Sequence, residues 1–195
     1  MAAEEAEAEA EARLIERARG GDREAYAALV ERHQQRLGGY LVHLIGDREL
    51  ALDLTQDTFV RAYTALGATR PGLALRPWLF RIATNLAYDV LRRRRRIAWV
   101  PLSSAVDRAR DDAAPIEEQE LVRLALRRLR PGEQVVLVLC GIEDHSYAEA
   151  ASALDSTPDA VRKRLTRAKE HFRAAYAELS REVFPTSTTR PARER

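Results

Sequence analysis

The sequence lacks the features of a sheet protein, a secreted protein or a membrane protein. Nine glycines in 195 residues and few runs of Val, Ile or Thr argue against a β-sheet fold. The single Cys140 excludes an internal disulfide and is typical of a reducing cytoplasm. No apolar run reaches the roughly 18 residues that span a bilayer, and residues 1–12 lack the parts of a signal peptide. We therefore expect a cytoplasmic protein without membrane insertion.

The sequence also lacks a strong overall charge, since its formal net charge is only +2. The charged residues are unevenly distributed along the chain. Residues 76–96 hold seven arginines and one acidic residue, and residues 155–175 hold six basic and three acidic residues. Folding can place such a segment on one face, where its local field attracts a polyanion such as a nucleic acid.

Hydrophobic residues make up 46% of the chain and charged residues 32%, which is enough apolar surface for a core covered by solvated helices. Helical periodicity predicts an all-α fold with two helical domains, residues 13–98 and 117–184, joined by a flexible linker at residues 99–116. The acidic residues 1–12 and the Pro/Thr/Arg-rich residues 185–195 are expected to be disordered tails.

Several residues predict helix boundaries in the first domain. The glycine pairs at positions 20–21 and 38–39 are expected to interrupt helices. Asp47 is a good N-cap for a helix that ends near Leu66, and Pro77 fits the first turn of the next helix, which runs to about Ile97.

The second domain carries the pattern of a helix-turn-helix. Ser146 and Glu149 form a capping box for a short helix, and Thr157 with Pro158 starts a longer one after a tight turn. Apolar residues recur along one side of the longer helix, and its N-terminal half is basic, as in a helix that enters a major groove. The candidate DNA contacts are Thr157, Asp159, Arg162, Lys163, Arg164 and Arg167. The alternative is a helical hairpin with a solvated basic face.

The helix of residues 47–66 has a polar face in addition to its apolar one. That face is formed by Asp53, Gln56, Asp57, Val60 and Arg61, which recur at helical spacing. Two carboxylates, an amide and one valine fit either a solvated surface or a protein docking site, and composition alone favours the solvated surface.

The following helix is divided in the same way. Its core candidates are Trp78, Leu79, Ile82, Ala83, Leu86 and Val90. A second stripe is formed by Arg81, Thr84, Asn85, Tyr88 and Arg92. Such a stripe can hydrogen-bond to unpaired bases and stack on them, although an arginine run alone is as often a generic polyanion patch.

Four stretches in order resemble bacterial sigma factors of the extracytoplasmic-function group. "RARGGDREAYAALVERH" is similar to the family's opening helices, and "ALDLTQDTFVRAY" resembles region 2.2. "RPWLFRIATNLAYDVLRRRRR" resembles regions 2.3 and 2.4, and "SYAEAASALDSTPDAVRKRLTRAKEHFR" resembles region 4.2. Asp155 stands where the family usually has a turn glycine, and Ser156 replaces a usual aliphatic residue. Aspartate tolerates a left-handed backbone, so the turn is expected to survive.

The resemblance implies partners and roles for the stretches it covers. Core RNA polymerase would dock on the face of Asp53, Gln56, Asp57, Val60 and Arg61. The melted −10 element of promoter DNA would bind Arg76, Trp78, Arg81, Asn85, Tyr88, Arg92 and Arg93. The helix from Pro158 would read the −35 element as a duplex. The family also implies a possible anti-sigma factor, and it implies no cofactor.

Other classes of protein fit less well. The four histidines are scattered and form no metal motif with Cys140, and no glycine-rich loop is present to hold a phosphate, so an enzyme is not expected. A helix-turn-helix regulator that binds an operator without docking on polymerase is the main alternative, but it has no use for the Asp53/Gln56/Asp57 face. A pure protein scaffold would not need the basic helix.

Overall fold

The structure is a computed structural model that describes residues 2–98 and 118–183, and within these ranges the chain forms helices and no strands. The predicted all-α fold is confirmed. The expected linker at residues 99–116 and the expected C-terminal tail lie outside the described residues. None of the helices in the described ranges is both long and apolar enough to cross a membrane.

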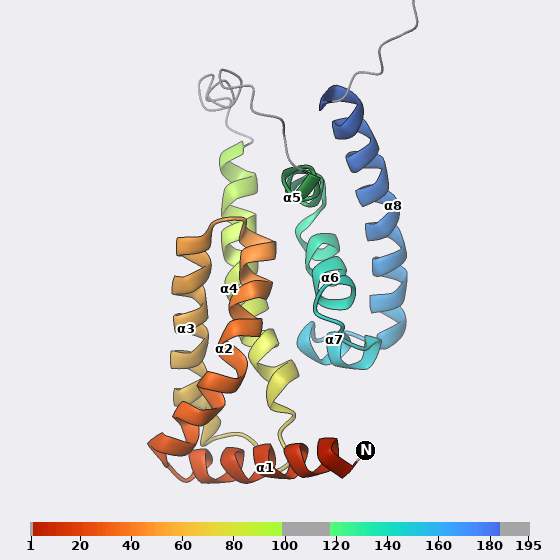
Figure 1. Cartoon of the computed structure of the whole chain (residues 1–195). Coiled ribbons are helices and arrows are strands. Elements are labelled where there is room, and N and C mark those ends of the chain that lie inside the picture. The colour runs from red at the N-terminus through yellow and green to blue at the C-terminus, as the bar shows by residue number, and fades with distance from the viewer. Residues whose placement is uncertain (1, 99–117, 184–195) are drawn as a thin grey trace, which may run out of the picture.

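The N-terminal module consists of four helices (Figure 1). They are α1 (Ala2–Arg19), α2 (Arg23–Ile45), α3 (Arg48–Leu66) and α4 (Leu75–Ala98). Helices α2, α3 and α4 pack side by side, and α1 lies across one end of this bundle. The core is aliphatic and aromatic, with Leu37, Tyr40 and Phe80 among its fully buried side chains.

Capping residues fix the ends of these helices. Asp22 accepts hydrogen bonds from the backbone N–H groups of Glu24 and Ala25, both at 3.0 Å. Asp47 accepts one from Leu50 at 3.1 Å, and α3 ends at Leu66, so the predicted boundaries of α3 are confirmed. Each carboxylate satisfies donors that an α-helix leaves unpaired in its first turn.

Two expectations for this module, one helix interruption and one disordered tail, are wrong. Helix α2 continues through Gly38 and Gly39, because Leu37, Tyr40 and Leu41 on either side are all fully buried and tertiary packing outweighs the low helix propensity of glycine. Residues 2–12, expected as a disordered tail, are helical and continuous with α1. Alanine and glutamate have high helix propensity, and Glu11 pairs with His33 of α2 at 3.4 Å.

The C-terminal module contains α5 (Glu118–Arg128), α6 (Pro131–Gly141), α7 (Tyr147–Ala153) and α8 (Pro158–Val183). The predicted capping box is present, since the Ser146 hydroxyl accepts from Glu149 N at 3.2 Å and the Glu149 carboxylate accepts from Ser146 N at 2.8 Å. Asp155 has φ +50°, the left-handed conformation expected at the turn. Helices α7 and α8 therefore form the predicted helix-turn-helix.

The two modules pack directly against each other, with α7 on α4 and α6 on both α2 and α4. One hydrophobic cluster runs through both of them. Phe80 and Ala87 of α4 are buried although they lie outside the predicted core stripe, and Thr84, placed on the polar stripe, is also buried. Helix α4 is buried on two sides, and the sequence pattern alone shows only the side that faces α2 and α3.

The buried Tyr40–Thr84 pair gives a stability test for the N-terminal module. Their hydroxyl oxygens lie 2.6 Å apart. Tyr40→Phe leaves the Thr84 hydroxyl without this partner, and we expect it to lower the free energy of unfolding by about 1–3 kcal/mol in urea titrations followed by circular dichroism. Tyr147→Phe is the matched control, because Tyr147 is 44% exposed. Equal stability of the two variants would contradict a structural role for the pair.

Candidate nucleic-acid and protein interfaces

Helix α3 presents its predicted polar face to solvent as one surface. Asp53, Gln56, Asp57, Val60 and Arg61 are all exposed, while the opposite side of the helix is buried in the bundle. Helix α3 itself lies on the far side of the N-terminal bundle from the C-terminal module, as Figure 1 shows. The structure thus brings together all five residues of the predicted docking face.

Apolar residues extend this face beyond the predicted set. Leu52 is 60% exposed and Tyr63 is 41% exposed, beside Val60 at 63%. Tyr63 packs edge-on against Tyr26 of α2 with ring centroids 4.9 Å apart, and a groove of about 720 Å³ runs between the two helices there. Contiguous exposed apolar side chains mark protein-contact surfaces. Leu52 precedes Gln56 by one helical turn, so helical spacing could have revealed it.

The N-terminal turns of α8 expose most of the predicted duplex-binding residues. The Thr157 hydroxyl accepts a hydrogen bond from Ala160 N at 3.2 Å and so acts as the expected N-cap. Asp159 pairs with Arg162 one turn later. Lys163 and Arg167 are exposed, whereas Arg164 is half-buried. The exposed basic side chains lie where a recognition helix contacts bases and phosphates.

The predicted single-strand-binding residues of α4 do not form one open face. Asn85, Arg92 and Arg93 are exposed, and the Arg92 guanidinium lies 5.6 Å from the centre of the Tyr88 ring. Trp78 is half-buried and packs on the core. The remaining members, Arg76, Arg81 and Tyr88, lie against the C-terminal module: Arg81 pairs with Asp155 at 3.5 Å, and the Tyr88 hydroxyl lies beside Gly132.

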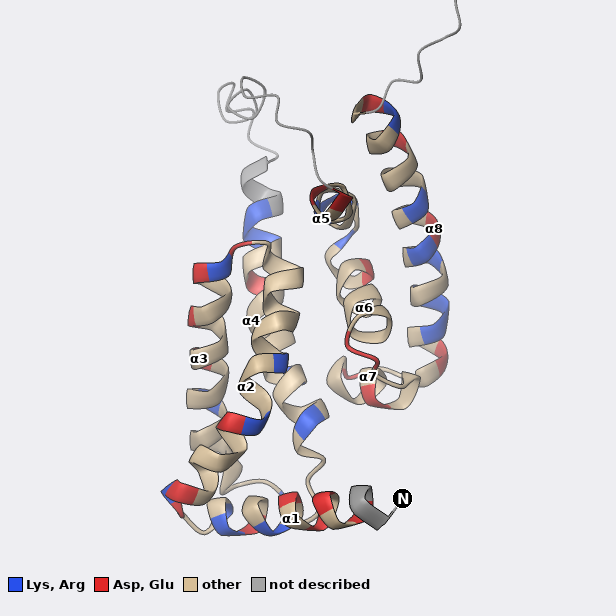
Figure 2. Cartoon of the chain, in the orientation of Figure 1, with Lys and Arg blue, Asp and Glu red and all other residues tan. Residues whose placement is uncertain are grey.

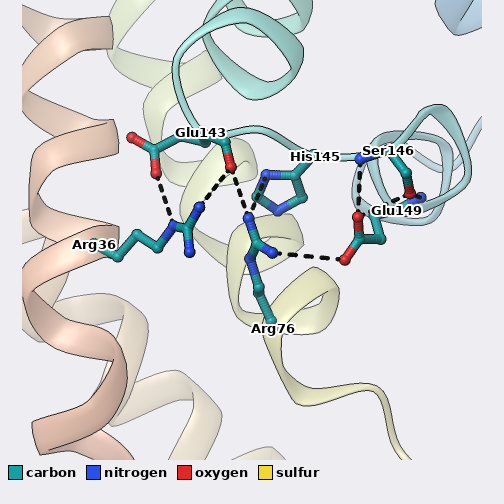
Figure 3. A network of polar contacts seen from close by, with 6 residues as sticks. All are labelled: Arg36, Arg76, Glu143, His145, Ser146 and Glu149. Carbon is teal, nitrogen blue, oxygen red and sulfur yellow. Dashed lines mark hydrogen bonds and ion pairs between the residues drawn. The ribbon is translucent and has the colours of Figure 1, made fainter. Parts of the chain in front are cut away.

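Arg76 is held in a network that joins the two modules (Figure 3). Its Nη2 donates to the carbonyl oxygen of Glu143 at 2.7 Å, and its Nη1 lies 3.7 Å from the Glu149 carboxylate. Arg36 of α2 donates to the same carbonyl at 2.9 Å and pairs with the Glu143 carboxylate at 3.4 Å. We call Arg36, Arg76, Glu143, His145 and Glu149 the interdomain cluster. Of these five, only Arg76 was predicted as a functional residue, and Glu149 was predicted only to cap α7.

Burial sets the protonation of this cluster. His145 is only 3% exposed and packs edge-on against Phe80 at 4.4 Å between ring centroids. Its burial and the neighbouring Arg76 charge lower its pKa to about 4. Nη2 of Arg76 lies 3.4 Å from His145 Nδ1, which suits a neutral ring that accepts there. Burial also raises the pKa of Glu143, although Arg36 works against that shift.

A basic cleft lies between the modules further along α4, and none of the interdomain cluster lines it. It has a volume of about 1260 Å³. Its charged wall includes Arg92 and Arg93 of the N-terminal module, and Arg130, Arg164 and Arg167 of the C-terminal module. Residues predicted to hold the −10 strand and residues predicted to read the −35 duplex thus face the same space. The lining also holds Asp89 and Glu133, so the five arginines leave the cleft with a net positive charge.

Two family models match the chain, Sigma-70 region 2 at residues 29–97 and Sigma-70 region 4 at residues 119–172. The RNA polymerase sigma factor CarQ of Myxococcus xanthus is 33% identical over 173 residues, which cover 87% of this chain and 99% of CarQ. The ECF RNA polymerase sigma factor SigE of Mycolicibacterium smegmatis is 35% identical over 162 residues, or 80% of this chain and 63% of SigE. The solved structure of CnrH in complex with the cytosolic domain of CnrY matches with a TM-score of 0.67 at 29% identity, covering 87% of this chain and 98% of CnrH.

The chain therefore belongs to the sigma-70 family of RNA polymerase sigma factors, in its extracytoplasmic-function group. It is a factor that binds core RNA polymerase and directs promoter recognition and transcription initiation, rather than an operator-binding regulator. Members of the family act as regulators without an enzymatic step of their own.

His145 provides a test of the packed arrangement. In the full chain without polymerase, we expect NMR of its imidazole to give a pKa of about 4, well below the ordinary value of about 6.5. Since the packed form binds this proton less readily than the separated form, His145 opposes packing increasingly as the pH falls from about 6.5 to 4. The raised pKa of Glu143 acts in the opposite direction. A His145 pKa near the ordinary value would show that the modules are apart in solution.

Proposed function

We propose that the two modules divide promoter recognition between them while α3 attaches the factor to polymerase. The observation that carries this proposal is the position of the α3 face. Asp53, Gln56 and Asp57 are exposed together, beside Leu52 and Val60, and none of them is covered by the C-terminal module. A surface with two carboxylates and large exposed apolar side chains fits a protein partner better than a nucleic acid.

The N-terminal module, residues 13–98, would capture the melted −10 strand. Asn85 offers an amide for base edges, and Tyr88 with Arg92 offers a flat, cationic platform for an unpaired base. Arg76, Arg81 and Arg93 would contact the phosphates, and Trp78 would support the loop that precedes α4. No cofactor and no catalytic residue is needed for these steps, and the protein would act in the cytoplasm as a non-enzymatic factor.

The C-terminal module, residues 117–184, would fix the register on the −35 duplex. Thr157 and Asp159 begin the recognition helix, and Arg162, Lys163, Arg164 and Arg167 follow within its first three turns. CnrH has been solved with the cytosolic domain of CnrY bound to it. By analogy, an inhibitory protein that covers the α3 face would silence this factor without touching a DNA-reading residue.

The docking role of α3 is tested by the double variant Asp53→Ala/Gln56→Ala. Both side chains are exposed, so we expect unchanged thermal unfolding and a loss of affinity for core polymerase of about tenfold or more in a pull-down or fluorescence titration. Glu7→Ala, an exposed acidic residue on α1, is the charge control and should bind normally. Wild-type binding by the double variant would remove α3 from the interface.

The recognition helix is tested by Arg162→Ala in the holoenzyme. If Arg162 reads a base, we expect a loss of about 1–3 kcal/mol and relaxed specificity at one position of the −35 element. If it contacts a phosphate, all sequences should weaken alike and the salt dependence should flatten. Arg173→Ala, exposed further along the same helix, is the control. Unchanged affinity at every salt concentration would contradict the role of α8.

A further inference from the structure

The loop between α3 and α4, residues 67–74, leads the chain directly into the helix that is proposed to bind the −10 strand. Its tip, Arg70, Pro71 and Gly72, is exposed, and Gly72 has φ +75°, a left-handed backbone that suits a sharp turn. The backbone N–H groups of Arg70 and Gly72 have no acceptor within residues 2–98 and 118–183. An arginine beside free backbone donors suits a ligand that carries many acceptor atoms, such as a nucleic-acid strand.

Thr69 fixes the first half of this loop to the bundle. Its backbone N–H and its hydroxyl both donate to the carbonyl oxygen of Leu66, at 3.0 and 2.6 Å. Its own carbonyl oxygen accepts from Nη2 of Arg19 at 2.6 Å, a hydrogen bond that joins residues 50 positions apart. Beyond the tip, Leu73 packs on the hydrophobic core. The exposed tip is therefore held at both ends, and Arg19 helps to hold one of them.

Arg19 is the last residue of α1, and this end of α1 lies against the loop. Ile15 and Ala18 are buried in the core and fix the end of the helix. Glu16 accepts from Nη1 of Arg19 at 2.7 Å, which leaves Nη2 for the loop. A Cβ at Gly67 would lie 3.8 Å from the carbonyl oxygen of Arg19, and Figure 1 shows the loop running beside α1. The charge colouring of Figure 2 shows that the arginines of α1 lie in this half of the helix.

The hydrogen bond from Arg19 also sets the direction of the Arg70 N–H, because the Thr69 carbonyl and the Arg70 N–H belong to one peptide unit. A trans peptide is planar, and its C=O and N–H point in opposite directions. While Arg19 holds the carbonyl oxygen toward α1, the Arg70 N–H points away from α1. One of the free donors at the tip therefore has its direction fixed by a residue of α1.

The burial of Arg19 indicates a specific use of its guanidinium group. The side chain is only 17% exposed, and its Nε is buried without a hydrogen-bond partner in the described part of the chain. A buried donor without a partner costs free energy, and methionine would fill a similar space without that cost. Methionine cannot donate to the Thr69 carbonyl oxygen, so the hydrogen bond to the loop is what the arginine adds.

We propose that Arg19 is a positioning residue for −10 recognition, which holds residues 67–74 in the conformation that meets the melted strand. Arg19 itself does not touch DNA, and it acts through the peptide unit of Thr69 and Arg70. Helix α1 then contributes to promoter selectivity. This inference rests on the proposed −10 role of the N-terminal module and extends that role to α1.

Arg19→Met tests the proposal, because it removes the donor and keeps a long, flexible side chain. The assay is open-complex formation by the reconstituted holoenzyme, on a promoter that it transcribes and on each single-base variant of that promoter's −10 element. We expect the preference for the parent −10 sequence over at least one variant to fall by about three- to tenfold, the change that one hydrogen bond of ordinary net strength makes in an equilibrium constant. Affinity for core polymerase should stay at the wild-type value, because the α3 face is unchanged.

Two matched variants separate the hydrogen bond from the fold. Arg19→Lys keeps a donor that can reach the Thr69 carbonyl oxygen, so it should restore most of the preference that Arg19→Met loses. Arg13→Met removes an arginine of the same helix whose side chain is 75% exposed, and it should behave as wild type. The proposal is refuted if Arg19→Met keeps the full preference, or if Arg19→Lys loses as much of it as Arg19→Met does.

Thr69→Ala loosens the loop without changing α1, and it provides the test if Arg19→Met does not fold. It removes the hydroxyl that donates to Leu66 and leaves the carbonyl acceptor in place. We expect a loss of −10 preference in the same direction as for Arg19→Met, whereas Thr69→Ser, which keeps the hydroxyl, should retain most of the preference. Wild-type preference in Thr69→Ala would show that the anchored conformation of the loop does not serve −10 recognition.

Asn85→Ala distinguishes failure of this inference from failure of the proposed function. Asn85 is exposed on α4, and its removal should impair open-complex formation in the holoenzyme. If Asn85→Ala is neutral there, the proposed −10 role of the N-terminal module is wrong and the inference falls with it. If Asn85→Ala is impaired while Arg19→Met and Thr69→Ala keep the wild-type preference, the −10 role stands and only the positioning role of Arg19 is refuted.

Discussion

Helix α4 packs against two partners and is also proposed to bind a DNA strand, and this constraint organises the molecule. Leu79, Ala83 and Leu86 hold it in the N-terminal bundle, and Phe80 brings it against His145 of the C-terminal module. The residues of α4 proposed to bind DNA lie along the margins of these two contacts. The side of α4 that would receive the −10 strand is therefore also the side on which the C-terminal module can rest.

Charge and burial act in opposite directions at that contact. Burying Glu143 and His145 costs free energy, which the raised pKa of Glu143 and the lowered pKa of His145 both reflect. Arg36 and Arg76 offset part of this cost by pairing with Glu143. A contact to which favourable and unfavourable contributions are both made can be opened by a partner that binds only one form.

The sequence was most informative where structure is set locally. Asp47, Ser146 and Pro158 lie at the helix starts that their capping chemistry predicts, and Asp155 adopts the left-handed turn. The same reasoning was wrong at Gly38, where packing with neighbouring helices keeps α2 continuous through a residue that favours a break. Helix propensity describes an isolated segment, and burial outweighs it when the residues on both sides of the segment lie in a core.

The contact between modules could not be predicted in this way. Glu143 reads in the sequence as a solvated turn residue and Arg36 as part of a polar helix face, and no periodicity links them across 107 positions. Phe80 and Ala87 indicate a contact of this kind, because they are apolar residues of α4 outside the stripe that packs into the N-terminal bundle. An apolar residue on a supposedly polar face indicates a second partner, although it does not say which one.

The central claim is that the C-terminal module of the free factor packs on α4, on the side proposed to receive the −10 strand. Pulsed electron-spin resonance can measure this with spin labels at Glu24→Cys on α2 and Glu170→Cys on α8, two exposed positions, in a Cys140→Ser background. We expect one narrow distance in the free protein, equal to that in the packed structure, and a longer distance after core polymerase is added. A broad distribution in the free protein that polymerase leaves unchanged would contradict the account.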